Sequence, residues 1–258
     1  MEPIQLDFVD LGLALGMMAI AIGLSAWQGL GLEGKLALAT ARTVVQLLVV
    51  GSLLEIVFEW QHPLAVLAVI ITMLTIAAVV SRNQIGKKIP VLPLIWGALF
   101  ASTALTMIYV NLVVLRSPEA WARPQYLIPL TGIVLGTAMN GAAIAGERLV
   151  STIKNSPIEI ETHLSLGATP QQALAVYRQE AIKAGLIPTV NAMMVVGVVK
   201  LPGIITGQIL SGVNPLNAAA YQILIMFMLA FATLITSIIL TSGLCRTFFD
   251  KNSQLRSF

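Results

Sequence analysis

The sequence predicts an all-α integral membrane protein, and its composition carries that prediction. Of 258 residues, 57% are hydrophobic and only 10% are charged, whereas soluble chains carry about 25% charged residues. The mean hydropathy is +0.88. Such a chain crosses a bilayer as helices, because lipid offers no partner to an unpaired backbone N–H or C=O. Continuous apolar runs such as Ala65 to Val80 lack the alternation of barrel strands and argue against an outer-membrane β-barrel.

Seven segments are apolar and long enough to cross the hydrocarbon core, which takes about 17–25 helical residues. They run from Phe8 to Gln28, Leu36 to Phe58, Pro63 to Val80, Val91 to Leu115, Tyr126 to Ala145, Leu186 to Gly212 and Leu216 to Leu244. The sixth is predicted to be broken at Lys200-Leu201-Pro202-Gly203, because Pro202 removes a backbone hydrogen bond and Gly203 loosens the next helical turn. Residues 1–258 are expected to form one membrane domain.

The basic residues predict which side of the membrane each connection faces, because Lys and Arg concentrate in cytoplasmic loops. They mark three segments as cytoplasmic: the third connection with Arg82, Lys87 and Lys88, residues 147–188 with Arg148, Lys154, Arg178 and Lys183, and the tail with Arg246, Lys251 and Arg256. With seven alternating spans, the N-terminus lies outside and the C-terminus in the cytoplasm. The acidic start does not resemble a signal peptide, so we expect the first span to be retained.

Residues 147–188 form the main polar interruption, and we call them the central polar segment. Ser156 with Glu159 predicts a capping box at a helix start, and Thr169 with Gln172 predicts a second. We expect the first helix to end at Gly167, so that two short helices meet there. Both predicted helices carry apolar residues at helical spacing: Ile160, Leu164, Leu166, Ala173, Leu174, Tyr177 and Ala181. An apolar edge of this kind predicts docking into a groove.

The sequence contains no recognisable nucleotide-binding, metal-binding or catalytic motif. The run from Gly29 to Lys35 approaches a phosphate-binding loop, but Leu36 stands where Ser or Thr must hold Mg²⁺. His62 and His163 have no partner at metal-ligand spacing, and no nucleophile cluster can be assembled. The single cysteine, Cys245, excludes an internal disulfide. We therefore expect no enzyme activity and no cofactor in the chain, and the sequence assigns no metal ligand.

Polar residues within the spans are candidates for a solute pathway, because burying them in lipid is costly. Arg42 and Gln46 are four residues apart on the second span, where Arg42 either snorkels to the interface or faces the bundle. Asn140 shares a helical face with Gly132 and Gly136, which suits either helix packing or pathway lining. The predicted pathway residues are Arg42, Gln46, Asn140, Lys200, Pro202, Gly203 and Gln208.

Lys200 is the most unusual of these pathway candidates. It lies fourteen residues after Leu186, or about 21 Å of helix, which places it well inside the hydrocarbon if the span starts at Leu186. Its charge then needs a partner, a water-filled cavity or an anionic substrate group. The alternative is that the span begins later and that Lys200 snorkels from a re-entrant turn.

Three blocks of sequence carry a family resemblance: Ala41 to Leu47, Leu166 to Pro170 with Gln172-Ala173, and Leu201-Pro202-Gly203 with Gly207, Gly212, Pro215, Tyr221 and Gln222. From about Arg42 to Phe231 the chain resembles the FetB-type ABC-transporter permeases. That family is described as the membrane half of a bacterial iron exporter, with plant relatives linked to aluminium tolerance. The resemblance implies a permease homodimer and a separate ATPase subunit that binds ATP and Mg²⁺.

The resemblance also implies a role for the central polar segment, which looks like the cytoplasmic coupling loop of ABC permeases. In that loop a Glu precedes a Gly by six positions, as Glu161 precedes Gly167 here. The implied ATPase-coupling residues are Glu161, Leu164, Leu166, Gly167, Ala168, Thr169 and Pro170.

We therefore predict a multi-pass permease subunit of the inner or plasma membrane, with export and iron homeostasis favoured by the resemblance. The alternative is a self-contained secondary transporter or channel, which the scarcity of carboxylates within the spans disfavours. A membrane scaffold is a weaker alternative. Iron, another metal, a sugar nucleotide and a lipid-like solute stay open as substrates. No nucleic-acid partner is expected.

Overall fold

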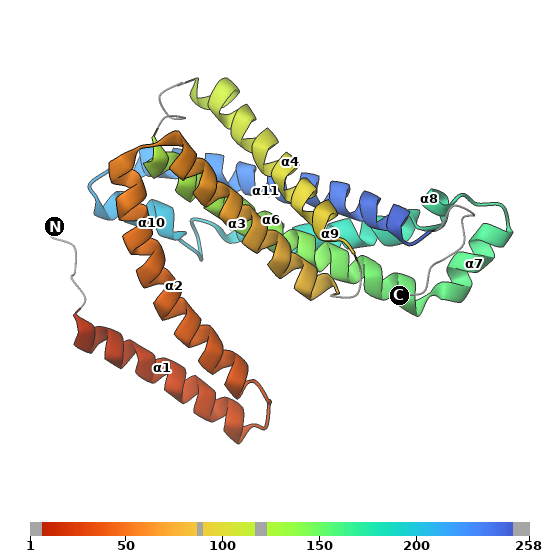
Figure 1. Ribbon diagram of the computed structural model, residues 1–258, viewed down its shortest axis with the longest axis horizontal. Coiled ribbons are helices and arrows are strands. Elements are labelled where there is room, and N and C mark those ends of the chain that lie inside the picture. The colour runs from red at the N-terminus through yellow and green to blue at the C-terminus, as the bar shows by residue number, and fades with distance from the viewer. Residues whose placement is uncertain (1–6, 87–89, 117–122, 250–258) are drawn as a thin grey trace. The chain divides into compact units, whose positions relative to one another are not determined.

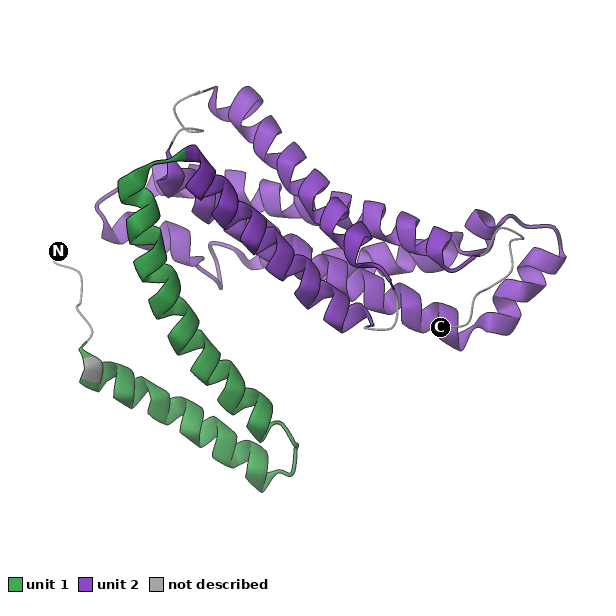
Figure 2. Cartoon of the chain, in the orientation of Figure 1, with its two compact units in different colours: residues 1–62 green, residues 63–258 purple. Residues whose placement is uncertain are grey.

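The computed structural model describes residues 7–86, 90–116 and 123–249, and every regular element in them is a helix (Figure 1). The chain divides into two compact units, residues 1–62 and residues 63–258 (Figure 2). The all-α membrane fold predicted from the sequence is confirmed, whereas the expectation of one membrane domain stays a prediction.

Unit 1 is a helical hairpin of α1 (Phe8–Trp27) and α2 (Glu33–Trp60). The chain reverses through Gly29 and Gly31, whose φ angles of 63° and 65° suit residues without a Cβ. The Ser25 hydroxyl donates to the Glu33 carboxylate at 3.1 Å and closes the turn. Most other side chains of the hairpin are exposed, and most of the exposed ones are apolar, which suits a lipid-facing or partner-facing pair.

Unit 2 is a bundle in which two long central helices, α6 (Pro124–Asn155) and α11 (Pro215–Thr247), pack against each other. Three more helices surround them: α3 (Pro63–Ile85), α4 (Leu92–Tyr109) and α9 (Ala175–Val195). A π-helical segment, η1 (Val110–Leu115), continues α4. The core between these helices is apolar and includes Leu74, Ile95, Leu99, Leu149, Leu240 and Leu244.

Two glycines let the backbones of α6 and α9 approach closely. A Cβ at Gly185 would lie 2.6 Å from the Gly141 carbonyl oxygen and 2.9 Å from the Ala145 Cβ, both under van der Waals contact. Gly141 is equally confined by the Thr233 side chain on α11. Small residues at this crossing let three backbones converge, as in other membrane bundles.

We expect Gly185→Ala to lower the free energy of unfolding by about 1–3 kcal/mol, because the added methyl group overpacks the α6–α9 crossing. Thermal unfolding of the purified protein in detergent measures this. Gly136→Ala is the matched control on α6, since a Cβ there meets nothing within 4 Å. Equal melting temperatures for the two variants would show that the crossing tolerates a methyl group.

Six helices of the described residues are long and apolar enough to cross a membrane, roughly as the sequence predicted. The predicted span Leu186 to Gly212 is not among them, because it is divided as expected. Helix α9 ends at Val195, and the short helix α10 (Gly203–Leu210) begins after Pro202, its N-cap. The predicted boundaries were less accurate: α6 runs ten residues past Ala145, and α9 begins eleven residues before Leu186.

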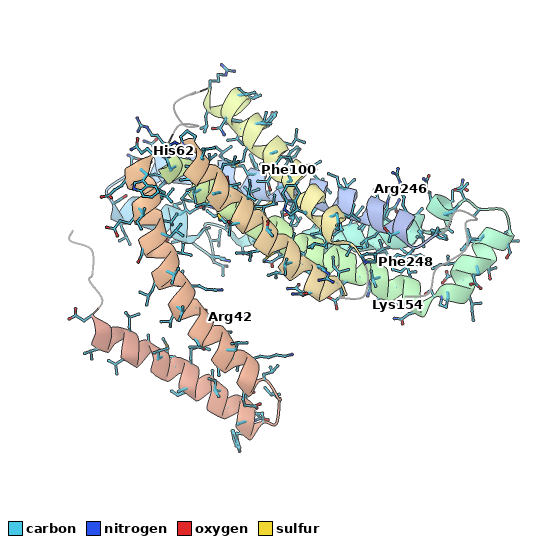
Figure 3. The ribbon with its side chains drawn as sticks, in the orientation of Figure 1. Arg42, His62, Phe100, Lys154, Arg246 and Phe248 are labelled. Carbon is cyan, nitrogen blue, oxygen red and sulfur yellow. The ribbon has the colours of Figure 1, made fainter. Side chains whose placement is uncertain are left out.

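Several basic residues of unit 2 lie at one end of its bundle. The Ile85 side chain packs on Gly146, and the Leu94 side chain packs on Gly243, so the end of α3 and the start of α4 lie beside the C-terminal parts of α6 and α11. Lys154 and Arg246 lie at the end of unit 2 that also carries α7 (Pro157–Ser165) and α8 (Pro170–Ala173) (Figures 1 and 3). Lys87 and Lys88 fall outside the described residues.

This end is predicted to be cytoplasmic. In a background with Cys245 replaced by alanine, we expect a membrane-impermeant thiol reagent to modify Trp60→Cys in sealed cells and Asn155→Cys only after permeabilisation. Both positions are exposed within their own units, so reactivity reports sidedness rather than burial. Modification of Asn155→Cys in sealed cells would reverse the predicted topology.

Candidate functional site

A cavity of about 460 Å³ lies in unit 2 between α6, α9, α10 and α11. Its walls are largely apolar, with Ile133, Ile225 and Leu229 among them. Five polar side chains interrupt this surface: Thr137, Asn140, Thr189, Lys200 and Gln222. A mostly apolar pocket with a few convergent polar groups is the usual form of a small-molecule site.

Gln222 is the strongest indication that the cavity takes a polar ligand. Its side chain is only 5% exposed, yet its Oε1 atom has no hydrogen-bond partner in the described structure. Leaving a buried acceptor unpaired costs about 1–3 kcal/mol. A ligand that donates to Oε1 would recover this energy, and the buried Thr189 hydroxyl lines the same cavity.

Two helix irregularities shape the wall formed by α9 and α10. Pro188 lies inside α9 and lines the cavity, and its missing N–H leaves the carbonyl of Ala184 without its helical donor. Beyond Val195 the chain turns back, with the Gly197 N–H donating to the Lys200 carbonyl at 3.0 Å and the Lys200 N–H donating to the Val195 carbonyl at 3.2 Å. Free backbone acceptors and turns of this kind border solute sites in transporters.

The structure places Lys200 in this turn rather than inside a continuous helix, because α9 has already ended at Val195. Its side chain is exposed and contributes to the cavity lining. The alternative that the span begins later than Leu186 does not describe α9, which begins at Ala175 and ends at Val195, five residues before Lys200.

Four of the seven predicted pathway residues meet at this cavity: Asn140, Lys200, Pro202 and Gly203. Gln208 lies on α10 but is not part of the lining. Arg42 and Gln46 belong to unit 1, where both are exposed on α2, so their place in a pathway stays a prediction. Thr137, Thr189 and Gln222 also line the cavity and were not predicted from the sequence. Gln222 could have been predicted as a pathway residue, since it is an amide near the start of a long apolar run.

The charge of the cavity lining is positive. Lys200 is the only ionisable group among the described lining residues, and none of them is a carboxylate. The described residues also contain no group of three or more His, Cys, Asp or Glu side chains arranged to hold a metal ion. The lining therefore suits a neutral or anionic polar solute better than a bare cation.

The second predicted site, the α7–α8 connection, has a well-defined backbone. Helix α7 ends in a Schellman motif: the Gly167 N–H donates to the Leu164 carbonyl and the Ala168 N–H to the His163 carbonyl, both at 3.0 Å. The φ angle of Gly167 is 89°, which favours glycine. Helix α8 then starts in the capping box predicted for Thr169 and Gln172, with bonds of 2.9 and 3.3 Å.

The other predicted capping box, between Ser156 and Glu159, is wrong. Ser156 makes no side-chain bond to the helix, because its φ and ψ of −124° and 43° depart from the extended N-cap conformation. Both side chains instead lie near the Tyr177 phenol on α9 and influence its pKa. Burial, followed by the hydrogen bond to Glu159, raises the pKa of Tyr177 to about 12, so the phenol stays protonated and links α7 to α9.

Burial separates the apolar residues of the central polar segment into two groups. Ile160, Leu174 and Ala181 are completely buried, so the predicted apolar edges mostly attach the segment to its own bundle. Leu166 is 80% exposed at the tip of the α7–α8 turn, beside the exposed Gly167 and Thr169. Exposed Glu161 and partly buried Leu164, Ala168 and Pro170 complete the predicted coupling set. Ile158 on α7 and Val176 on α9 are also exposed, at 79% and 62%, so docking by the predicted coupling residues stays a prediction.

The sequence model of the "Uncharacterised protein family (UPF0014)" matches residues 8–249 of this chain. The chain belongs to the UPF0014 family. A UPF0014 membrane protein of Synechocystis is 53% identical over 253 residues, covering 98% of this chain and 97% of the relative. The "Probable iron export permease protein FetB" of Escherichia coli is 31% identical and "Protein ALUMINUM SENSITIVE 3" of Arabidopsis thaliana is 32% identical. Each alignment covers 95% of this chain, and 93% and 88% of the respective relatives. No solved structure matches the chain.

UPF0014 membership confirms the predicted family and the predicted multi-pass membrane location, with the bacterial relatives indicating the plasma membrane. The relatives' names describe membrane and permease proteins, which favours transport over enzyme activity.

Proposed function

We propose that this UPF0014 chain is the membrane-spanning permease subunit of an ABC transporter, driven by a separate ATPase subunit that binds ATP and Mg²⁺. The observation that carries the proposal is the α7–α8 turn, which exposes Leu166 at the basic end of the bundle. An exposed leucine on a rigid turn provides a small apolar anchor for a groove on a soluble partner.

In this proposal the cavity lined by Lys200 and Gln222 holds the solute. Helix α9 connects the two sites directly, because Tyr177 near its start bonds α7 and Thr189 on the same helix lines the cavity. Movement of the docked ATPase would tilt α7 and α9 together and change access to the cavity as a rigid-body motion. Two permease copies related by a two-fold axis would present one turn to each of two ATPase subunits.

The direction and the substrate come from the likeness to the Escherichia coli protein, whose name gives iron export. We propose export and a role in iron or other metal homeostasis. The positive cavity fits a metal carried as an anionic complex, since no described lining residue offers a carboxylate, imidazole or thiolate ligand.

A self-contained secondary transporter or channel is the second candidate, and the buried residues argue against it. Every buried polar side chain in the described residues is Ser, Thr, Asn or Gln. Proton- or sodium-coupled carriers use carboxylates within the membrane to bind the coupling ion. Energy would therefore come from outside this chain.

Co-expression of the chain with ATPase subunits from the same genome, followed by affinity purification, tests the function. We expect one ATPase to co-purify and its ATP hydrolysis to rise when a candidate metal complex is added. Solute uptake or release by vesicles that contain the chain alone, without ATP, would favour the secondary transporter instead.

A further inference from the structure

A second cavity, of about 420 Å³, lies at the basic end of unit 2 and is separate from the proposed solute cavity. It is bounded by α8, α9 and the end of α11, and two arginines line it, Arg178 and Arg246. The remaining walls include Gln171, Ser242 and Phe249. Neither the proposed solute pathway nor the exposed Leu166 turn explains two guanidinium groups in one cavity.

Arg178 is the residue that needs explanation. Its Nε atom is buried and has no hydrogen-bond partner in the described structure, and no described carboxylate forms an ion pair with it. The Arg178 side chain is partly buried, and its Nε–H is withdrawn from water without an acceptor, which is costly. The helix dipole does not compensate, since Arg178 is near the N-terminus of α9, where positive charge is disfavoured.

Arg246, the second arginine of the cavity, differs from Arg178 in its position along its helix and in its exposure. It lies in the last turn of α11, where a cation is favoured by the dipole, and its side chain is exposed (Figure 3). One partly buried and one exposed guanidinium in one cavity form a positive site that is open to solvent. The planar guanidinium group of arginine can donate two parallel hydrogen bonds to the oxygens of one phosphate group.

We propose that this cavity binds a phosphate group, held by Arg178 and Arg246. The site lies at the end of a membrane-spanning helix, which is the depth of lipid headgroups, and basic pockets between membrane helices bind anionic headgroups there. A bound phosphate would join the start of α9 to the end of α11, whereas the solute cavity lies along the later part of α9. The same chemistry is available from a free phosphate ion, so the experiment separates the two sources.

Native mass spectrometry of the purified full-length protein tests the proposal, with phosphatidylglycerol and phosphatidylcholine as probes. We expect the anionic lipid to be retained about tenfold more strongly, equivalent to about 1.4 kcal/mol. The double variant Arg178→Gln/Arg246→Gln should lose this preference. Arg148→Gln, which removes an exposed arginine of α6 outside the cavity, should keep it.

The second part of the experiment measures thermal stabilisation of the protein by inorganic phosphate. Thermal stabilisation by millimolar phosphate that depends on the two arginines identifies a soluble anion, whereas stabilisation by phosphatidylglycerol alone identifies a lipid headgroup. If the double variant does not fold, Arg246→Gln alone decides, because that side chain is exposed and its removal spares the core. The proposal is overturned if the wild-type protein neither prefers phosphatidylglycerol over phosphatidylcholine nor is stabilised by inorganic phosphate. It is also overturned if Arg246→Gln binds phosphatidylglycerol and inorganic phosphate as strongly as the wild type does.

Discussion

Replacing Leu166 with aspartate is expected to abolish co-purification of the ATPase subunit and ATP-driven transport while the membrane bundle stays folded. Leu166 is 80% exposed, so the substitution disturbs no internal packing. In the docked complex the carboxylate would be desolvated without a partner, which costs several kcal/mol. We therefore expect the affinity for the ATPase to fall by at least about a hundredfold, or about 2.7 kcal/mol.

Leu216→Asp is the matched control for this prediction. Leu216 is also 80% exposed, but it lies in the first turn of α11, at the other end of that helix from Arg246. An acidic residue there is favoured by the helix dipole. Pull-down of the ATPase and the thermal unfolding of both variants give the comparison. Normal ATPase binding and normal transport by Leu166→Asp would remove the α7–α8 turn from the coupling mechanism.

Replacing Lys200 with methionine is expected to leave the complex assembled and to raise the solute concentration for half-maximal stimulation of ATP hydrolysis at least about tenfold, or about 1.4 kcal/mol. Lys200 is the single charge among the described residues of the cavity lining, and it projects from an exposed turn rather than from the core. Removing it takes away the positive potential that attracts an anionic solute.

Lys183→Met controls for loss of charge elsewhere on the same part of the chain, because Lys183 is exposed on α9 and does not line the cavity. This variant should show half-maximal stimulation at the wild-type solute concentration. Identical half-saturation for Lys200→Met and wild type, in complexes that hydrolyse ATP normally, would exclude Lys200 from solute binding.

Local patterns in the sequence were sufficient for several features of this protein. Hydropathy predicted the helices because each membrane span must satisfy its own backbone hydrogen bonds. The break before Gly203 and the capping box of Thr169 result from the chemistry of two to four adjacent residues. The stop at Gly167 is equally local, since the Schellman motif needs a left-handed residue.

Other features depended on contacts between residues distant in the sequence. The capping box of Ser156 and Glu159 is absent, and both side chains lie near the phenol of Tyr177, eighteen positions beyond Glu159. The Gly141–Gly185 crossing carried no recognisable spacing motif, because its two members lie on different helices.

Composition and local pattern were enough to predict an all-helical membrane protein, a broken segment near Lys200 and a polar segment with a tight turn at Gly167. Each of these depends on composition or on neighbours along one helix. That Asn140 and Lys200 share a cavity with Gln222, and that Arg178 and Arg246 share another, depends on how the helices pack. The physical reason is that helix packing, and not the periodicity of any one helix, determines which polar side chains converge.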